Sequence, residues 1–346
     1  MSNPPKQDEA SSVRYRRLEK RGEGTYGIVF KAEDQITSKI VALKIMKLEQ
    51  EEDGIPPTTL REMSILRSVS HPNLVKLEDV IINSTSLTLV FEYLEYDLRF
   101  FLRHTKNRIQ MKLLRSYAFQ MLAGINCLHT HRILHRDIKP DNILLNKEGY
   151  LKICDFGLAR HFDIPMRQYS ANVVSQWYRA PELLLGAPIY GLPIDVWSAG
   201  CIIAEMCKGT PLFEGDSDVD QLHKIFKILG TPIQGQCQQL MRNAIYEMDE
   251  ETNKPKDVSF TMNVVSIVHN DKTDSNLYKV ISNDVSFPIY PKKDLREELQ
   301  TDDLELIDLI EKMLIFEPDK RITIQEAMKH PFFDSLSPPI RKMCSA

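Results

Sequence analysis

The feature that most constrains the fold is a change in residue pattern near residue 92. Before that point the pattern predicts one helix over 58–69 and four β-type segments, GIVFKA (27–32), KIVALKIM (39–46), NLVKLEDVII (73–82) and SLTLVFEY (86–93). After it, apolar residues recur at helical spacing, which predicts helices over 113–131, 192–208, 219–229 and 303–314. We therefore expect an α+β, bilobed fold, with a small β-rich lobe, a larger mainly helical lobe and a cleft at their junction.

The chain of 346 residues is long enough for such a bilobed unit, since 42% of its residues are hydrophobic. We expect a disordered tail over 1–13 and a C-terminal tail over 337–346. The folded part then divides into a small lobe over 14–92, a hinge over 92–97, and a large lobe over 98–336 with an enlarged insert at 233–286.

Composition narrows the possible partners. A net charge of −4 gives no global reason to expect nucleic acid, and no run of about 18 uncharged apolar residues predicts a membrane span. The N-terminal MSNPPKQDEASS has no apolar core of a secretory signal, and the six cysteines form no C-x-x-C pair. We expect free thiols and a place in the nucleus, the cytoplasm or both.

The segment GEGTYG (22–27) contains the pattern G-x-G-x-x-G, which is weak evidence alone. Its glycines could form the turn of an ordinary hairpin, or they could let the backbone approach phosphates closely. Because IVFKA continues as a strand where a dinucleotide-binding fold would open a helix, the pattern favours a hairpin over phosphates.

Lys44 lies in the otherwise apolar strand VALKI, where an unpaired ammonium is costly. Glu62, in the predicted helix of GIPPTTLREMSIL (54–66), is a candidate partner, and phosphate oxygens could accept the remaining hydrogens. A solvated surface lysine and glutamate is the alternative. Pro56 and Pro57 restrict the approach to this helix, and Thr58 or Thr59 could cap it.

Three further motifs follow in order: HRDIKPDN (135–142), DFG (155–157) and APE (180–182). Asp137 could accept a proton from a substrate hydroxyl, and Lys139 could steady a transferring phosphoryl group. Asn142 and Asp155 offer oxygen ligands of the kind that Mg²⁺ prefers. Asp137 alone could be a turn or cap residue, but the three motifs together favour the catalytic interpretation.

These motifs resemble those of protein kinases across residues 14–336. The resemblance implies ATP and Mg²⁺ as cofactors, Asp137 as catalytic base, Lys44 with Glu62 on the phosphates, and a Glu182–Arg321 pair in the large lobe. It also implies a nucleotide site formed by Gly22, Glu23, Gly24, Thr25, Tyr26, Gly27, Val29, Ala42, Lys44, Phe91, Glu92, Leu94, Asp97 and Leu144.

Within the kinases the chain is most similar to the cyclin-dependent kinases. Their helix signature PSTAIRE appears as PPTTLRE (56–62), and GEGTYG, DFGLAR, WYRAPELLLG and ILGTP also resemble this family. The resemblance implies that a cyclin binds this helix and brings Glu62 to Lys44. An ordinary helix without a partner is the alternative.

The resemblance also implies regulation by phosphorylation. An upstream kinase would modify Ser170, whose phosphate, with about −1.5 to −2 charges, could join Arg61, Arg136 and Arg160. Phosphates on Thr25 and Tyr26 would be inhibitory, because they would misplace ATP. Val174 and Arg179 match residues that favour proline directly after the target Ser or Thr.

Four features depart from the family pattern: Arg21 in place of an aliphatic residue, Ser170 in place of threonine, Asp141 in place of Gln or Glu, and the long segment 233–286.

Three other classes of protein remain possible. A mitogen-activated kinase would need T-x-Y where this chain has YSANVVS, and a metabolic transferase would not need the APE-closed segment. A pseudokinase scaffold is disfavoured because the catalytic residue types are intact.

Overall fold

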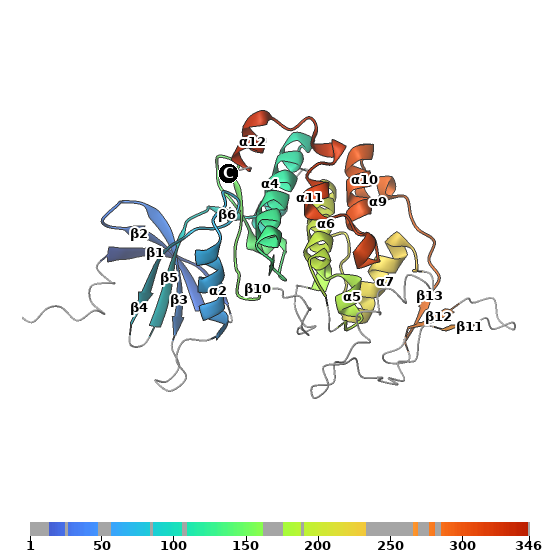
Figure 1. The fold of residues 1–346 in the computed structure, drawn as a ribbon, viewed down its shortest axis with the longest axis horizontal. Helices are drawn as coiled ribbons and strands as arrows, with labels where there is room; N and C mark the ends of the chain where they lie inside the picture. Colours follow the sequence, from blue (N-terminus) through green and yellow to red (C-terminus); the bar gives the residue numbers. More distant parts are fainter. Residues whose placement is uncertain are drawn as a thin grey trace, which may run out of the picture.

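The structure is a computed structural model that describes residues 14–24, 27–47, 57–83, 86–105, 109–161, 176–187, 190–232, 266–268, 277–280 and 285–344. It has the bilobed α+β architecture expected from the sequence: a sheet at one end and a larger group of helices at the other (Figure 1).

The small lobe is an antiparallel five-stranded sheet in the order β1-β2-β3-β5-β4. Its strands are β1 (Tyr15–Gly24), β2 (Gly27–Asp34), β3 (Ile40–Lys47), β4 (Leu77–Ile82) and β5 (Ser86–Glu92). The sequence pattern missed β1, because this edge strand, YRRLEKRGEG, is mostly charged and carries little apolar alternation.

Helix α2 (Pro57–Ser68) accompanies the sheet and begins one residue before the predicted start. Pro57 suits the first helical position because its missing N–H would have no partner there. Thr59 does not cap the helix: its side chain is buried and donates a hydrogen bond to Met46 Sδ of β3 at 3.4 Å. This contact fixes the first turn of α2 against the sheet.

The large lobe is built around α4 (Met111–Thr130) and α6 (Pro193–Lys208), which lie side by side. Nearly every residue of α6 is buried, as expected of a helix that is apolar on all sides. Gly200 lets α6 approach α10 (Leu304–Met313), since a Cβ there would lie 3.0 Å from Met313 Cβ. The other helices among the described residues are α3 (Leu98–His104), α5 (Pro181–Leu184), α7 (Asp218–Leu229), α9 (Leu295–Leu299), α11 (Ile324–Ala327) and α12 (Pro338–Met343).

Short strands position the loops at the junction of the lobes. They are β6 (Tyr96–Asp97), β8 (Ile143–Leu145) and β9 (Leu151–Ile153) in one sheet, and β7 (Ile133–Leu134) with β10 (Arg160–His161) in another. The 3-10 turns of the described residues are η1 (Pro140–Asn142), η2 (Gln176–Tyr178), η3 (Pro318–Lys320) and η4 (Pro331–Phe333). The backbone of Ile153 bonds to Asn73 and Val75, which ties the approach to β4 to the large lobe.

The insert contains structure that the sequence did not resolve into elements. Strands β11 (Ser266–Val268), β12 (Leu277–Val280) and β13 (Val285–Pro288) form a small antiparallel sheet, far from the small lobe in Figure 1. The C-terminal segment contains α12, and the Cys344 carbonyl lies 3.1 Å from His71 Nε2 at the base of the small lobe.

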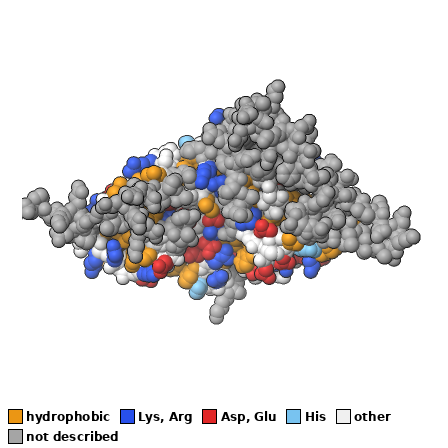
Figure 2. All heavy atoms as spheres, turned by 90° about the horizontal axis from the view of Figure 1, so that it is seen from below, with side chains coloured by type: hydrophobic (Ala, Val, Ile, Leu, Met, Phe, Trp, Pro, Cys, Tyr) orange, Lys and Arg blue, Asp and Glu red, His pale blue; other side chains and the backbone are white. Residues whose placement is uncertain are grey.

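On the face shown in Figure 2, basic and acidic side chains of the described residues are interspersed. None of the helices in the described part of the chain is both long and apolar enough to span a bilayer. The five cysteines among the described residues are free thiols, and Cys201, Cys207 and Cys344 are buried.

Candidate active site

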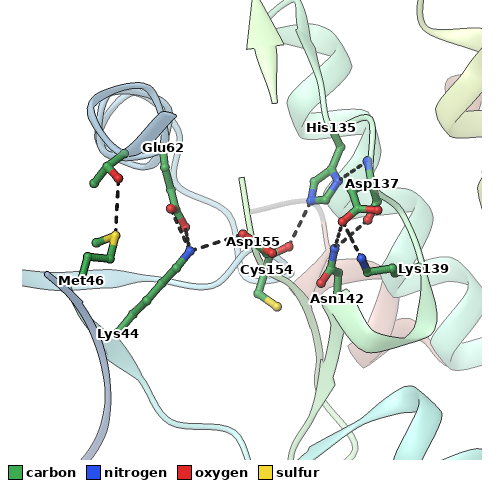
Figure 3. Close-up of polar contacts among 10 residues, drawn as sticks. Lys44, Met46, Glu62, His135, Asp137, Lys139, Asn142, Cys154 and Asp155 are labelled. Carbon is green, nitrogen blue, oxygen red and sulfur yellow. Dashed lines mark hydrogen bonds and ion pairs between the residues drawn. The ribbon is translucent and has the colours of Figure 1, made fainter. Parts of the chain in front are cut away.

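Lys44 of β3 and Glu62 of α2 form an ion pair on the sheet side of the cleft (Figure 3). Lys44 Nζ lies 2.9 Å from both carboxylate oxygens of Glu62 and 3.4 Å from Asp155 Oδ1. The Glu62 side chain is almost fully buried, and its ion pair with Lys44 explains why a charged residue is tolerated there. The predicted pairing of these two residues is therefore confirmed, and the alternative of a solvated surface pair is wrong.

Lys44 and Asp155 stabilise each other's charged forms, whereas burial raises the pKa of the Glu62 carboxyl. Burial disfavours the ammonium form of Lys44, but Glu62 and Asp155 outweigh burial and raise its pKa. Burial likewise works against the carboxylate of Asp155, yet the Lys44 ammonium lowers the pKa of that carboxyl. Lys44 is thus held as a cation and Asp155 as an anion at the same point in the cleft.

Asp137, Lys139 and Asn142 form a second group on the large-lobe side of the cleft. Lys139 Nζ lies 2.7 Å from Asp137 Oδ2, and Asn142 Nδ2 donates to the same oxygen at 2.9 Å and to the Asp137 carbonyl at 2.8 Å. Two donors therefore fix the orientation of the Asp137 carboxylate, as a positioned general base requires.

A buried carboxylate of α6 accepts hydrogen bonds from the backbone segment directly before Asp137. Asp195 accepts hydrogen bonds from the N–H groups of His135 and Arg136, each at 3.0 Å, and lies 2.9 Å from His129 Nε2. Arg136 adopts a left-handed φ of 66°, a strained conformation for a non-glycine residue. The sequence reading did not identify Asp195, since nothing in DVWSAG shows that this carboxylate meets residues about sixty positions earlier.

His135 connects this segment to DFG. The Asp137 N–H donates to His135 Nδ1 at 3.2 Å, so Nε2 carries the proton and donates to the Cys154 carbonyl at 3.1 Å. The imidazole also packs edge-on against the buried Phe156 ring. Asp155, between these residues, has a left-handed φ of 63°. The left-handed backbone conformations of Arg136 in HRDIKPDN and of Asp155 in DFG are thus held by the contacts of neighbouring residues.

Asn142 and Asp155 could hold a divalent cation together with phosphate oxygens. The Asn142 amide nitrogen is engaged by Asp137, which leaves its oxygen as the atom suited to a cation. The Asp155 carboxylate is about two-fifths exposed toward the cleft. No group of three or more His, Cys, Asp or Glu side chains gathers as a metal site in the described part of the chain. Two protein ligands suit an ion that also binds substrate phosphates.

A cavity of about 360 Å³ is lined by Lys44, Glu62 and Asp155 of the first group and by Asn142 of the second. Of the expected nucleotide residues, those that line it are Gly22, Val29, Ala42, Lys44, Phe91, Glu92, Leu94, Asp97 and Leu144. Val29 and Ala42 come from the sheet and Leu144 from β8, so a flat ring could lie between the lobes. A larger hollow of about 480 Å³, beside α4 and α12, contains none of the expected site residues.

Glu62, expected beside Lys44, and the two expected cation ligands also line the cavity. The expected nucleotide residues did not include Arg21, Val75, Tyr93, Glu95, Tyr96, Asp141 and Cys154, which line it as well. Arg21 NH2 donates to the Glu95 carbonyl at 3.0 Å and thereby connects β1 to the hinge. The N–H of Glu92 donates to the Lys76 carbonyl and is therefore not available to a bound nucleotide. Their position within the expected hinge (92–97) was the signal that could have identified Tyr93 and Glu95.

Several expected residues lie apart from the cavity or outside the described residues. Glu23, Gly24 and Gly27 are in the β1–β2 hairpin but not among the lining residues. Gly27 has a φ of 137° and sits against the Ile45 carbonyl, where a Cβ would lie at 2.3 Å, so the backbone requires glycine. Thr25, Tyr26, Ser170, Val174 and the side chain of Arg61 lie outside the described part.

The backbone brings the segments of the expected regulatory residues Arg136 and Arg160 together. Arg160 of β10 pairs with Leu134 of β7, and Leu134 lies two residues before Arg136. Arg136 is buried and donates to the Leu158 carbonyl and the Tyr190 hydroxyl. Arg179 makes a 2.9 Å ion pair with Asp218 at the start of α7.

The expected Glu182–Arg321 pair is present and fully buried. Arg321 NH1 and NH2 lie 2.9 and 3.2 Å from the two oxygens of Glu182. The same guanidinium donates to the carbonyls of Pro193, Ile315 and Phe316. This pair joins the APE segment to α6 and to the end of α10.

A model of the protein kinase domain family matches residues 15–333. The match spans nearly the whole chain and agrees with the two lobes and the cleft between them. The chain belongs to the protein kinase family, whose members transfer a phosphoryl group from ATP with the help of a divalent metal ion.

Proposed function

We propose that the chain is a cyclin-dependent serine/threonine kinase of cell-cycle control that transfers the γ-phosphoryl group of ATP to Ser or Thr followed by Pro. The observation that carries the catalytic part is the Asp137 carboxylate, which Lys139 and Asn142 orient toward the cleft opposite Lys44 and Asp155. One group suits a substrate hydroxyl and the other suits phosphates, and a phosphoryl transfer needs both.

Each residue has a distinct task in this proposal. Lys44, fixed by Glu62, binds the non-transferred phosphates. Asp137 orients the substrate hydroxyl and accepts its proton, while Lys139 neutralises charge beside the transferring group. Asn142 and Asp155 would hold Mg²⁺, which when bound neutralises the phosphate oxygens and aligns them for attack.

We place the binding surface for the cyclin on α2. This helix carries the PPTTLRE resemblance and Glu62, and Leu60 on it is half exposed. A large apolar side chain on the surface next to a catalytic glutamate is suited to a protein partner. A cyclin bound there would hold α2 against β3 and stabilise the Lys44–Glu62 pair.

Regulation and specificity are assigned by the resemblance. A phosphate on Ser170 would be bound by Arg136 and Arg160 together with Arg61, while phosphates on Thr25 or Tyr26 would inhibit. Val174 and Arg179 would favour proline after the target residue. The place of action is the nucleus, the cytoplasm or both.

The test is phosphoryl transfer from Mg-ATP to a Ser-Pro peptide and to its Ser-Ala control, with the protein alone and with candidate cyclins. We expect transfer that depends on a cyclin, prefers Ser-Pro and is lost in Ser170→Ala. Full activity without a partner would contradict the cyclin assignment, and equal use of both peptides would contradict the proline preference. Nucleotide binding without transfer under every condition would indicate a non-catalytic scaffold.

A further inference from the structure

The C-terminal segment contains a serine whose hydroxyl has no structural task in its helix. Ser337 stands at the N-cap position of α12, where a serine hydroxyl normally accepts a hydrogen bond from an N–H of the first turn. Its side chain makes no such bond. The next residues, Pro338 and Pro339, have no N–H, and the N–H groups of Ile340 and Arg341 donate to the Ser337 carbonyl instead. Helix capping therefore does not explain a serine at this position.

Ser337 is followed directly by proline, as the proposed substrate preference requires. The chain contains three Ser-Pro or Thr-Pro dipeptides, Thr210-Pro211, Thr231-Pro232 and Ser337-Pro338. The Thr231 hydroxyl is already engaged in both directions, since it donates to the Pro288 carbonyl at 2.9 Å and accepts from the Tyr290 N–H at 2.8 Å. Thr231 is therefore not available as a phosphate acceptor in the folded chain.

Thr210 is exposed, but the residues that follow it belong to the core. Leu212 and Phe213 are buried, and the Phe213 ring stacks on Trp197 of α6 with 6.0 Å between the ring centres. A substrate segment that enters the cleft of a kinase has to leave its own packing. Phosphorylation of Thr210 would therefore require the core of the large lobe to open.

Ser337, in contrast, lies in a segment that can enter a cleft at low cost. Its backbone is extended, with φ −63° and ψ 138°, as a following proline requires. Pro338 and Pro339 are exposed. Helix α12 has only six residues, and a helix this short is not stable in water by itself, so little energy is needed to straighten its first turn.

We propose that Ser337 is a phosphorylation site that a second copy of this chain modifies. This inference rests on the proposed Ser/Thr-Pro kinase activity. In the transfer, Ser337 Oγ of one copy attacks the γ-phosphorus of ATP in the cleft of the other copy. The bond from the γ-phosphorus to the oxygen that bridges it to the β-phosphorus breaks, ADP leaves, and the hydroxyl proton passes to the Asp137 carboxylate.

The modifying copy is a separate molecule because contacts on both sides of Ser337 hold the segment on the surface of the large lobe. Leu336, directly before it, is buried. The Arg341 guanidinium donates to the Phe333 carbonyl and lies 5.5 Å from the centre of the Phe119 ring of α4. The hollow beside α12 and α4 shares no residue with the nucleotide cavity, and α12 lies along α4 in Figure 1. Ser337 is thus presented to other molecules and not to its own Asp137.

The surroundings of Ser337 are also suited to the product. A phosphoserine carries about −1.5 to −2 charges at pH 7. Arg341 and Lys342 follow one turn later on α12, and no acidic residue occurs between Asp334 and the end of the printed sequence. The added negative charge therefore faces basic neighbours in its own segment.

The test uses two full-length versions of the chain. The wild type, under the conditions in which it phosphorylates a Ser-Pro peptide, is mixed with an excess of tagged Asp137→Asn, which lacks the catalytic carboxylate. After addition of Mg-ATP, mass spectrometry identifies the phosphorylated residues of the tagged copy. We expect phosphate on Ser337 of the tagged copy, because the modifying molecule is the wild type.

Matched variants of the tagged copy test the site. Phosphate at this position should be absent from D137N/S337A, while D137N/S335A should be modified at Ser337 as fast as D137N. Ser335 is the control because it is exposed and two residues away but is not followed by proline. In D137N/P338A the rate at Ser337 should fall by about tenfold, the size expected from one lost apolar contact in a specificity pocket. Melting temperatures verify that each variant is folded.

The outcomes separate this inference from the proposed function. If the wild type phosphorylates the Ser-Pro peptide but leaves Ser337 of the tagged copy unmodified, the inference is overturned and the kinase proposal stands. Phosphate on Ser337 of the wild type alone would mean transfer within one molecule, which also overturns it. An equal rate in D137N/P338A would show that the proline is not recognised. If neither the peptide nor the tagged copy is phosphorylated, both proposals fail.

Discussion

Lys44 Nζ lies 2.9 Å from each carboxylate oxygen of Glu62, eighteen positions later in the chain. This ion pair joins strand β3 to helix α2 inside the small lobe. Among the described contacts of the Asp155 carboxylate, the Lys44 ammonium is the only charged group that comes from the sheet. The pair with Glu62 sets the position of this ammonium. Its geometry therefore determines where the phosphates of ATP can be bound.

Glu62→Gln tests this dependence. Loss of one partner of a buried pair costs about 3 kcal/mol, and we expect a fall in kcat/KM on the order of 100-fold, because Lys44 is no longer held in place. Steady-state kinetics with a peptide substrate measure the effect. Glu311→Gln is the matched control, since Glu311 pairs with Lys292 on the surface and should change activity little. Equal effects of the two substitutions would contradict the assigned role.

Arg21→Met tests the connection between β1 and the hinge. The exposed hydrogen bond to the Glu95 carbonyl joins two residues that line the nucleotide cavity, so its loss should let nucleotide enter and leave faster, by about fivefold for a bond of ordinary strength. Stopped-flow measurements with a fluorescent ADP analogue give both rates. The affinity should change little, because both rates rise together. A large loss of affinity with an unchanged dissociation rate would mean that Arg21 contacts the nucleotide directly.

Arg321→Lys should destabilise the large lobe by about 3 kcal/mol. Lysine keeps the charge but cannot bond to both oxygens of Glu182 and to three carbonyls, since these contacts use the planar guanidinium. Urea unfolding followed by circular dichroism measures the change. Arg296→Lys is the control, because Arg296 pairs with Asp294 at the surface. A stability equal to that of the control would show that the charge alone suffices.

The buried Asp195 predicts a pH dependence of stability. Burial disfavours its carboxylate, but the bond to His129 and the N–H donors outweigh burial and lower its pKa. A lowered folded pKa means that the contribution is complete above the unfolded value of about 4 and is lost as the pH falls through the folded pKa.

We therefore expect Asp195→Asn to cost on the order of 3 kcal/mol at neutral pH, and the difference from the wild type to shrink below about pH 4. Urea titrations at a series of pH values measure it, with the exposed Asp319→Asn as control. A difference that stays constant down to the lowest pH, or that grows there, would contradict the assigned carboxylate role.

The sequence predicted well those features that are local or that carry a motif. The helices over 192–208, 219–229 and 303–314 match α6, α7 and α10 within one residue at each end, because their apolar spacing is strong. Lys44 and Glu62 were paired correctly because a lysine in an apolar strand needs an anion and the next helix offers one.

The sequence could not predict contacts that depend on how distant elements pack. Arg99 and Asp141 are 42 positions apart, and neither residue type indicates the other as its partner. Asp195 and His135 are likewise brought together only by the packing of α6 beneath the catalytic segment. The charged edge strand β1 and the small sheet β11–β13 lack the apolar alternation on which strand prediction depends.

The central claim is that Asp137 carries the chemistry of a protein kinase. The most direct measurement is a single-turnover transfer of labelled phosphate from Mg-ATP to a Ser-Pro peptide, compared between the wild type and Asp137→Asn, with ATP affinity measured in parallel. The account predicts an ATP affinity close to that of the wild type and a transfer rate lower by about 100-fold or more. Transfer at the wild-type rate in Asp137→Asn would contradict it.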